Sequence, residues 1–371
     1  MRWFYRHMVR PVLFYQDPER IHQRTLRGLG WVGRRGFACN ALASFLVPSP
    51  QPVRLWGLEF PNAVGLAAGM DKDAEALPAW SAMGFGFTEI GAVTRYAQPG
   101  NPTPRVFRAV AEEAIVNRMG FNNGGAEALA QALGAWRSQG RWPAHPVGVN
   151  LGKSKITPLD QAAGDYEESF RLLLPHLDFF VVNVSSPNTP NLRQLQDKAA
   201  LNEILMALQA ASRKWVDGGG RRKPVLVKVA PDLSFDALDE ILELVGPREL
   251  QGIVATNTTI SRPMVADAKV REVYAQTGGL SGKPLRARST DVIRHIYRQT
   301  RGALPIIGSG GIFNAADAWE KILAGASLVQ VYTGLVYEGP SVVKSIVEGM
   351  AARLEAAGFA SLQQAVGTGN S

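Results

Sequence analysis

Residues 179–192, "FFVVNVSSPNTPNL", begin as an unbroken apolar run and end in a cluster of amides, hydroxyls and prolines. An apolar residue at every position indicates a strand buried on both faces, as in a parallel sheet covered by helices. The polar cluster is too hydrophilic for a core and has too many hydrogen-bonding groups for a plain turn. The stretch therefore predicts a parallel strand whose carboxyl end carries a functional loop.

The same pattern recurs along the chain, at residues 62–69, 87–94, 146–152, 225–231, 252–259, 305–312 and 328–334. Most of these runs are followed by an amphipathic stretch typical of a helix, such as "FDALDEILELV" at 235–245. Eight strand–helix units over roughly 300 residues predict a closed (β/α)8 TIM barrel. An open doubly wound sheet is the alternative, and it is disfavoured because no early G-x-G-x-x-G turn is present.

Composition indicates a soluble globular fold, with 371 residues of which 46% are hydrophobic and 19% charged. The single cysteine, Cys39, excludes an internal disulfide and a cysteine-rich metal site. The five histidines have no paired spacing and none ends a predicted strand, so no metal site is expected. No apolar run reaches the roughly 18 residues of a membrane span, and the basic N-terminus lacks the apolar core of a signal peptide.

Residues 1–45 are predicted to form a small amphipathic helical hairpin, separate from the barrel at residues 46–371. Asp17 and Pro18 are a favourable cap and first residue for a helix, and "VPSPQP" at 47–52 cannot continue one. Residues 1–40 hold eight arginines against two acidic residues, an excess of six in a formal net charge of +8, together with seven aromatic residues. This combination favours an anionic lipid surface over a solvated domain face or a nucleic acid.

Polar residues, cations or glycines end every predicted strand, and in a barrel these ends meet at one rim where active sites lie. A lone Asn at a strand end is more often a turn former, but eight strands that end this way predict a binding site. Lys228 lies inside the apolar run "VLVKVAP" and needs an anionic or polar partner, so a structural ion pair is the alternative to a ligand contact.

Three glycine-rich segments end the later strands: "TGGLSGKPL" (277–285), "GSGGI" (308–312) and "VYTGL" (331–335). Barrels of this type commonly bind phosphate after the last two strands, where backbone N–H groups and a following helix N-terminus are exposed. We therefore expect a ligand that carries a phosphate.

Six motifs together resemble the dihydroorotate dehydrogenase family over essentially the whole chain: "AAGMDKDAE", "NRMGFNN", "NVSSPNTPNLR", "TNTT", "GGLSGKPL" and "IIGSGGI". The segment "FYQDPERIH" and the serine at position 186 resemble the membrane-associated, quinone-using class 2 of the family. Class 1 members lack that segment and use a cysteine as the base, whereas Cys39 is far from the predicted rim.

The resemblance implies oxidation of (S)-dihydroorotate to orotate in pyrimidine biosynthesis, with one FMN per chain and ubiquinone or menaquinone as the final acceptor. Ser186 would remove the C5 proton while the C6 hydride passes to flavin N5. The class 2 resemblance implies a peripheral membrane protein, and the lack of a recognisable targeting presequence leads us to expect the cytoplasmic face of a bacterial inner membrane. We expect a monomer with no nucleic-acid partner.

Carried onto this chain, the family's substrate contacts fall on Lys72, Asn117, Arg118, Met119, Gly120, Phe121, Asn183, Asn188, Asn257 and Thr258. Its FMN contacts fall on Ala68, Gly69, Met70, Asp71, Lys72, Ala92, Asn150, Asn183, Lys228, Thr256, Gly282, Gly311, Tyr332 and Thr333. The resemblance implies Thr at position 92 in many relatives, and only a backbone contact would survive the change to Ala that this chain shows. His22 and Arg108 are candidates for the quinone channel.

These residue types suit the implied chemistry. Amides match the imide edge of orotate, and Lys72 can offset its carboxylate. Lys228 can stabilise negative charge on the reduced flavin. A serine is a weak base in water, so Ser186 needs a desolvated site and a proton path, to which Thr189 or a buried water could contribute.

Two alternatives stay open on the sequence: a phosphate-binding barrel lyase or isomerase without flavin, and a non-enzymatic module recruited to membranes by residues 1–40. A flavin enzyme would purify yellow, which separates it from the lyase or isomerase. A binding module would bind lipid without turnover, and it leaves the polar rim unexplained.

Overall fold

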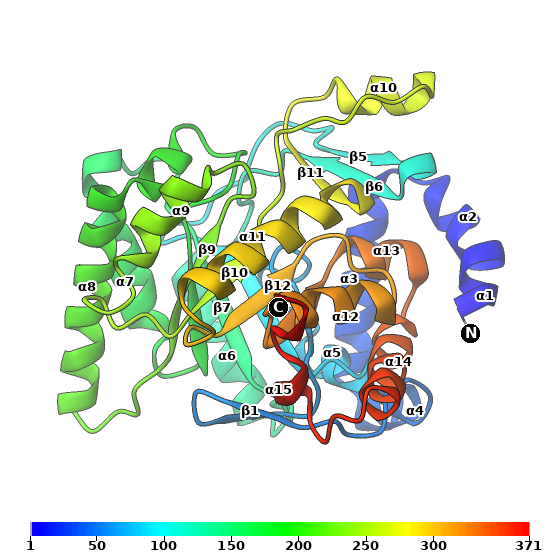
Figure 1. Cartoon of the computed structure of the whole chain (residues 1–371), viewed down its shortest axis with the longest axis horizontal. Helices are drawn as coiled ribbons and strands as arrows, with labels where there is room; N and C mark the ends of the chain where they lie inside the picture. The colour runs from blue at the N-terminus through cyan, green and yellow to red at the C-terminus, as the bar shows by residue number, and fades with distance from the viewer. Residues whose placement is uncertain (1, 371) are drawn as a thin grey trace.

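The computed structural model describes residues 2–370, and within them eight parallel strands close into a barrel surrounded by helices (Figure 1). The barrel strands, in their order around it, are β3 (Val64–Leu66), β4 (Phe87–Val93), β7 (Val147–Leu151), β8 (Phe179–Asn183), β9 (Val225–Val229), β10 (Gly252–Ala255), β12 (Ile306–Ser309) and β13 (Leu328–Val331). Each lies within one of the eight predicted runs. The (β/α)8 prediction is confirmed, and the open sheet is excluded because β13 pairs with β3.

Helices cover the outside of the barrel and bury their apolar faces against it. They are α5 (Leu77–Ala82), α6 (Ala126–Ser138), α7 (Ala162–Leu173), α8 (Lys198–Asp217), α9 (Phe235–Leu242), α11 (Arg286–Gln299), α12 (Ala315–Ala324), α13 (Thr333–Glu338), α14 (Val342–Ala356) and α15 (Leu362–Ala365). Short 3₁₀ segments at Val110–Glu112, Leu159–Gln161, Leu192–Gln196, Lys283–Leu285 and Thr368–Asn370 complete the connections.

Two small antiparallel sheets flank the barrel and were not predicted. One is the hairpin of β1 (Val53–Leu55) and β2 (Leu58–Phe60), and the other has the order β11–β6–β5 and lies beside α10, Ala268–Tyr274 (Figure 1). In this second sheet β11 (Gly279–Gly282) pairs with β6 (Ala114–Asn117), which pairs with β5 (Val106–Ala109). The glycine-rich segment 277–285 is therefore partly a strand, because a distant partner supplies hydrogen bonds that its own weak β propensity does not predict.

Aromatic rings fill the amino-terminal end of the barrel. The rings of Phe87 and Phe179 occupy the space beside Gly65 and Gly148, where an added Cβ would lie 2.2 Å from each ring. Phe60 of the β1–β2 hairpin packs edge-on against Phe87, with 5.6 Å between the ring centroids. This packing closes one end of the barrel and leaves the carboxyl end for ligands.

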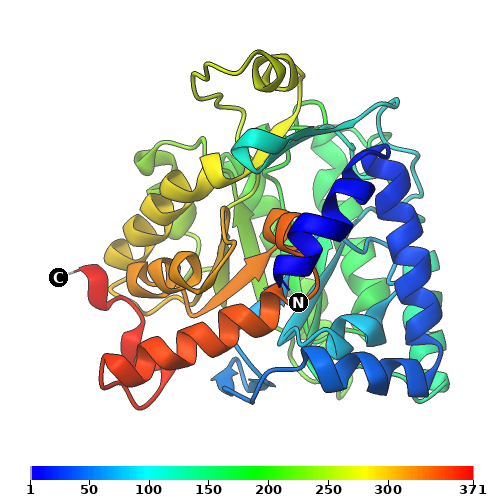
Figure 2. The same cartoon turned by 90° about the vertical axis from the view of Figure 1, so that its right-hand side faces the viewer.

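The N-terminal segment is a longer series of helices than the predicted hairpin (Figure 2). Its elements are α1 (Arg2–Phe4), a π-helix at Tyr5–Val9, α2 (Arg10–Phe14), α3 (Pro18–Gly33) and α4 (Gly36–Leu46). Asp17 caps α3 as expected, accepting hydrogen bonds from the N–H groups of Glu19 and Arg20. A buried ion pair joins Glu19 to Arg105, with 2.6 Å between Oε1 and the guanidinium, and anchors α3 to the barrel loops.

Three of the N-terminal arginines point toward the protein. Arg2 pairs with Glu338, Arg6 lies 3.3 Å from Glu113, and Arg10 lies 3.8 Å from the same Glu113 oxygen. The positive charge available to a membrane is therefore smaller than the sequence suggested. Within residues 2–370, no helix is both long enough and apolar enough to span a bilayer.

Burial of His145 makes folding sensitive to acid. Its Nε2 lies 2.9 Å from Thr88 Oγ1, and burial lowers the pKa of His145 from 6.5 to about 4. Because the unfolded chain binds the proton more tightly, stability should be lost as the pH falls from 6.5 through about 4, by up to about 3 kcal/mol from this residue. Urea unfolding measures the free energy of unfolding at pH 7 and at pH 4.5. The decrease between these two pH values should be smaller for His145→Gln than for the wild type. Equal losses in both proteins would contradict this origin.

Candidate functional site

A cavity of about 980 Å³, its solvent-open mouth included, lies at the carboxyl ends of the barrel strands. The predicted site residues that line it are Ala68, Gly69, Lys72, Ala92, Asn117, Met119, Gly120, Phe121, Asn150, Asn183, Ser186, Asn188, Lys228, Thr256, Asn257, Thr258, Gly282, Gly311, Tyr332 and Thr333. Strand-end positions that are far apart in the sequence therefore come together because the barrel closes.

Three of the residues predicted to contact the substrate or FMN do not line this cavity. Asp71 is fully buried and accepts hydrogen bonds from the backbone N–H of Glu75 and Ala76 and from the Trp80 indole, so it holds the loop after β3. Met70 faces a second cavity, described below. The guanidinium of Arg118 turns away to Gln276 and the Pro104 carbonyl, because neighbouring residues of an extended segment point to opposite sides.

Sequence reasoning missed a buried carboxylate at the barrel centre. Glu89 of β4 has no exposed side-chain surface and lies 3.9 Å from Lys228 Nζ. It accepts hydrogen bonds from the amides of Asn150, at 2.7 Å, and of Gln330 on β13. The available signal was the one carboxylate or amide side chain within each run, Glu89 in "FTEIGAVT" and Gln330 in "LVQVYTG". Lys228 thus has the carboxylate partner that a structural ion pair requires, which was the alternative to a ligand contact. It also lines the cavity.

A chain of amides leads from Glu89 to the loop after β8. Asn150 accepts a 2.7 Å hydrogen bond from the Asn183 amide. The other end of that amide, Asn183 Oδ1, accepts from the hydroxyl of Ser185 and from Nδ2 of Asn257. Because each amide both donates and accepts, the chain fixes which atom of each side chain faces the cavity.

Ser186 is buried with 5% of its surface exposed, and its Oγ accepts a 3.3 Å hydrogen bond from the Asn188 N–H. Asn188 also donates from Nδ2 to Asn117 Oδ1 at 3.2 Å, which joins this loop to β6. The buried hydroxyl of Thr189 has no hydrogen-bond partner within the described chain. Its place on a proton path therefore stays a prediction.

Lys72 supplies positive charge to the same side of the cavity. Its Nζ lies 3.5 Å from Met119 Sδ, and burial lowers the pKa of Lys72 to about 8. Below that pH the partly buried side chain is cationic, which suits a ligand carboxylate.

The glycine turn after β12, which lines the cavity, fits a phosphate-bearing cofactor. Gly310 and Gly311 turn with φ of +128° and +70°, and a Cβ at Gly311 would lie 2.4 Å from Arg286 Cβ, so the turn requires glycine. The buried Oε1 of Gln330 and Oδ1 of Asn188, both cavity residues, have no partner among the described residues. The donors and acceptors present match a ligand with both an anionic group and polar ring edges.

The two helices that follow the predicted phosphate segments differ. Asn314 caps α12 and accepts hydrogen bonds from the N–H groups of Ala316 and Asp317, so this helix N-terminus is already satisfied and only the glycine turn before it lines the cavity. α13 begins at Thr333 without a side-chain cap, and Thr333 and Gly334 line the cavity, so phosphate binding at this helix N-terminus stays a prediction.

An apolar tunnel lies between the N-terminal helices and the barrel, with a volume of about 1340 Å³ including its mouth. Its walls include Leu13, Phe14 and Leu29 from the helices and Leu335 from the barrel side. Asn117, Met119 and Tyr332 line both this tunnel and the polar cavity. The two spaces therefore meet at these three side chains.

His22 and Arg108, the two predicted channel residues, line the tunnel. Arg108 donates to the backbone carbonyls of Phe14 and Gln16, both at 2.9 Å, and so ties α2 to β5. Burial lowers the pKa of His22 to about 4, so its ring is neutral at pH 7. Within residues 2–370, no group of His, Cys, Asp and Glu side chains is arranged to hold a metal ion.

A polar cavity at the strand ends that adjoins an apolar tunnel defines a (β/α)8-barrel enzyme with two neighbouring sites. The family described as "Dihydroorotate dehydrogenase" matches residues 52–354. A dihydroorotate dehydrogenase (quinone) of Gloeobacter violaceus is 54% identical over 97% of this chain and 98% of its own length. That of Nostoc punctiforme is 50% identical over 98% of this chain and 97% of its own.

Solved structures agree with the sequence relatives. The crystal structure of DHODH from Eimeria tenella in complex with ferulenol superimposes with a TM-score of 0.84 at 36% identity, covering 96% of this chain and 98% of that one. The chain therefore belongs to the dihydroorotate dehydrogenase family.

Proposed function

We propose that the protein oxidises (S)-dihydroorotate to orotate in pyrimidine biosynthesis, using FMN in the polar cavity and a membrane quinone that enters through the apolar tunnel. The observation that carries this proposal is the meeting of the two spaces at Asn117, Met119 and Tyr332. A water-soluble anion and a lipid-soluble acceptor need chemically opposite entrances to one redox centre. The lyase, isomerase and binding-module alternatives do not account for the tunnel or for the family.

FMN, when bound, supplies the hydride acceptor for dihydroorotate and passes the electrons to the quinone. The cavity residues bind and orient: Lys72 faces the substrate carboxylate, and the amides of Asn117, Asn188 and Asn257 pair with the ring edges. Ser186, which is 5% exposed, accepts the C5 proton at its Oγ while its own hydroxyl proton passes to the proton path, for which Thr189 or a water is the candidate. Lys228, held above Glu89, places one cation on the cofactor side.

We also propose peripheral attachment to a membrane, on the cytoplasmic face of a bacterial inner membrane, through residues 1–45 of a monomer. Large apolar side chains are exposed on this segment, among them Trp3, Phe4, Val12, Tyr15 and Phe37. Because several arginines are paired internally, the apolar side chains should contribute more to attachment than the net charge. Interfacial insertion would bring the tunnel close to dissolved quinone.

Narrowing the tunnel should separate the two half-reactions. Leu13 lines the tunnel, and Leu13→Trp should slow reoxidation of the reduced flavin by a short-chain quinone at least about tenfold, since a displaced reactant loses rate steeply. Flavin reduction by dihydroorotate should stay within about twofold, because the polar cavity is untouched. Stopped-flow absorbance of each half-reaction measures both rates.

The neighbouring Val12 provides a matched control, because its side chain is 65% exposed and lies outside the tunnel. Val12→Trp should leave both half-reactions unchanged. Equal slowing of both half-reactions in Leu13→Trp would contradict a tunnel for quinone. Point substitution is preferable to deletion of residues 1–45, since deletion would leave Arg105 buried without Glu19.

A further inference from the structure

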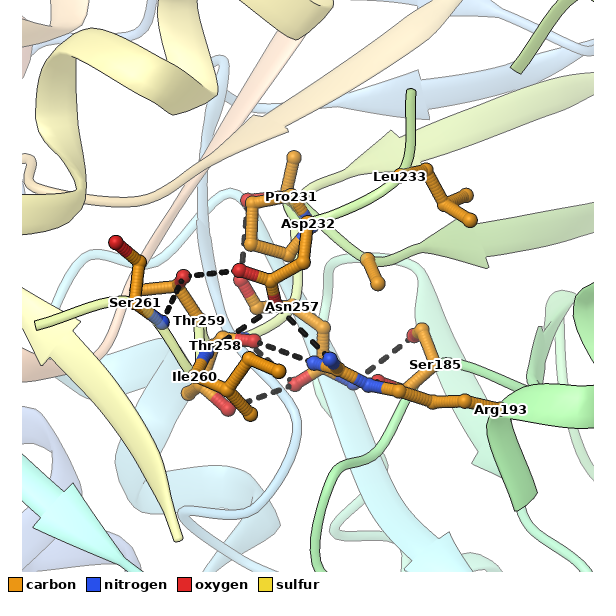
Figure 3. A network of polar contacts seen from close by, with 12 residues as sticks. Ser185, Arg193, Pro231, Asp232, Leu233, Asn257, Thr258, Thr259, Ile260 and Ser261 are labelled. Atoms are coloured by element: carbon orange, nitrogen blue, oxygen red, sulfur yellow. Dashed lines mark hydrogen bonds and ion pairs between the residues drawn. The ribbon is translucent and has the colours of Figure 1, made fainter. Parts of the chain in front are cut away.

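Arg193 contacts Ser185, Asp232 and Thr258, which belong to the loops that follow β8, β9 and β10 (Figure 3). It lies in the 3₁₀ segment Leu192–Gln196, just after that loop. Its Nε donates to the Ser185 carbonyl and one terminal nitrogen donates to the Thr258 carbonyl, both at 3.1 Å. The other terminal nitrogen lies 2.9 Å from Asp232 Oδ2. All three nitrogens of the guanidinium are therefore engaged, each with a different segment.

Asp232 extends these contacts to the loop after β10. Its Oδ1 accepts from the Thr259 hydroxyl, and its Oδ2 accepts from the Ile260 N–H at 3.2 Å. Thr259 in turn accepts a 2.9 Å hydrogen bond from the Ser261 N–H (Figure 3). One ion pair thus links the loops that follow β8, β9 and β10.

The two carbonyls held by Arg193 belong to residues next to the chemistry. Ser185 directly precedes Ser186, and its hydroxyl accepts a 2.9 Å hydrogen bond from Asn257 Nδ2. Thr258 lines the cavity and follows Asn257. Arg193 is not among the described residues that line the cavity, so it acts on the site only through the backbone that it holds.

We propose that Arg193, oriented by Asp232, is a positioning residue that sets the place of Ser186 relative to the substrate held by Asn257 and Thr258. This inference rests on the proposed function. The side chains of the ion pair are 22% and 19% exposed, and the same guanidinium also holds two backbone carbonyls, so the proposed effect on the site is geometric.

The geometry requires a guanidinium. Arginine presents five N–H donors in a rigid plane, whereas lysine has one compact ammonium on a flexible stem. Arg193→Lys keeps the positive charge beside Asp232 but cannot reach the Ser185 and Thr258 carbonyls at the same time. This one substitution therefore separates the effect of the positive charge from the effect of holding the two carbonyls in place.

The test compares Arg193→Lys with Arg288→Lys in the FMN-loaded full-length protein. Arg288 also holds the loop after β9, donating to the carbonyls of Pro231 and Leu233, but it makes no contact with Ser185 or Thr258. We expect Arg193→Lys to lower the limiting rate of flavin reduction by dihydroorotate at least about tenfold, with orotate affinity changed less than about threefold. Arg288→Lys should keep the wild-type rate.

Quinone reoxidation and FMN content should be unchanged in Arg193→Lys, which a merely structural role would not predict. If Arg193→Lys does not fold, Asp232→Asn tests the same link and should also slow only flavin reduction. A wild-type rate in Arg193→Lys, or an equal loss in Arg288→Lys, would overturn the positioning role. Failure of the wild-type protein to reduce flavin with dihydroorotate would instead overturn the proposed function.

Discussion

Ser186→Ala is expected to retain FMN but to lose roughly 10²- to 10⁴-fold in the rate at which dihydroorotate reduces the flavin. The Ser186 hydroxyl lies in the cavity, almost fully buried, and no described carboxylate or histidine lines that cavity as another base. Removing it leaves the substrate bound by the same amides and by Lys72, with no group to accept the C5 proton. Stopped-flow absorbance of the oxidised flavin measures the rate directly.

Ser185→Ala is the matched control for this prediction. Its hydroxyl bonds Asn183 and Asn257 and does not line the cavity, so its loss should cost less than about tenfold. Dithionite should reduce the flavin of both variants at the wild-type rate. Near-normal reduction of Ser186→Ala by dihydroorotate would remove Ser186 from the role of base.

Lys228→Met should destabilise the folded protein by about 3–5 kcal/mol, because it leaves the Glu89 carboxylate buried without a cation. Glu89 would keep its amide donors from Asn150 and Gln330, which cannot neutralise the charge. A second substitution, Glu89→Gln, should restore much of the loss. The free energy of urea unfolding of four cofactor-free proteins, the wild type, the two single variants and the double variant, gives the coupling between the two side chains.

Lys283→Met gives a control at an exposed ion pair. Lys283 is 54% exposed, and its partner Glu113 also lies near Arg6 and Arg10, so this change should cost less than about 1 kcal/mol. The buried-pair argument would be wrong if Lys228→Met were no more destabilising than Lys283→Met, or if the double variant were no more stable than Lys228→Met.

The contrast between Glu89 and Ser186 shows which parts of the site could be read in advance. Ser186 ends a predicted strand, and a parallel barrel brings all strand ends to one rim, so its place followed from a local pattern and the fold class. Glu89 lies inside a strand, and its partners are 61 and 241 residues away in the sequence. Only the stagger of closed strands brings them together.

The sequence also did not predict the direction in which individual side chains point. The basic N-terminus was visible as composition, but whether Arg2, Arg6 and Arg10 face a membrane or Glu113 and Glu338 depends on how the helices dock. Arg118 and Asp71 stand within recognisable motifs, yet neither lines the cavity. A motif predicts that its backbone passes the cavity. The direction of each side chain within the motif depends on the local backbone turns, which the motif does not predict.

By itself the sequence determined the barrel, its eight strands and most of the residues at the rim, because strand burial and strand-end polarity are encoded over a few consecutive positions. Only the tertiary structure showed the Glu89–Lys228 ion pair and the antiparallel sheet β11–β6–β5. It alone also showed that the cavity adjoins the tunnel and that Arg193 contacts three loops. Each of these joins segments that are distant in the chain. Their contacts depend on the closure of the barrel and on the register of its strands. No single segment of the sequence determines either property.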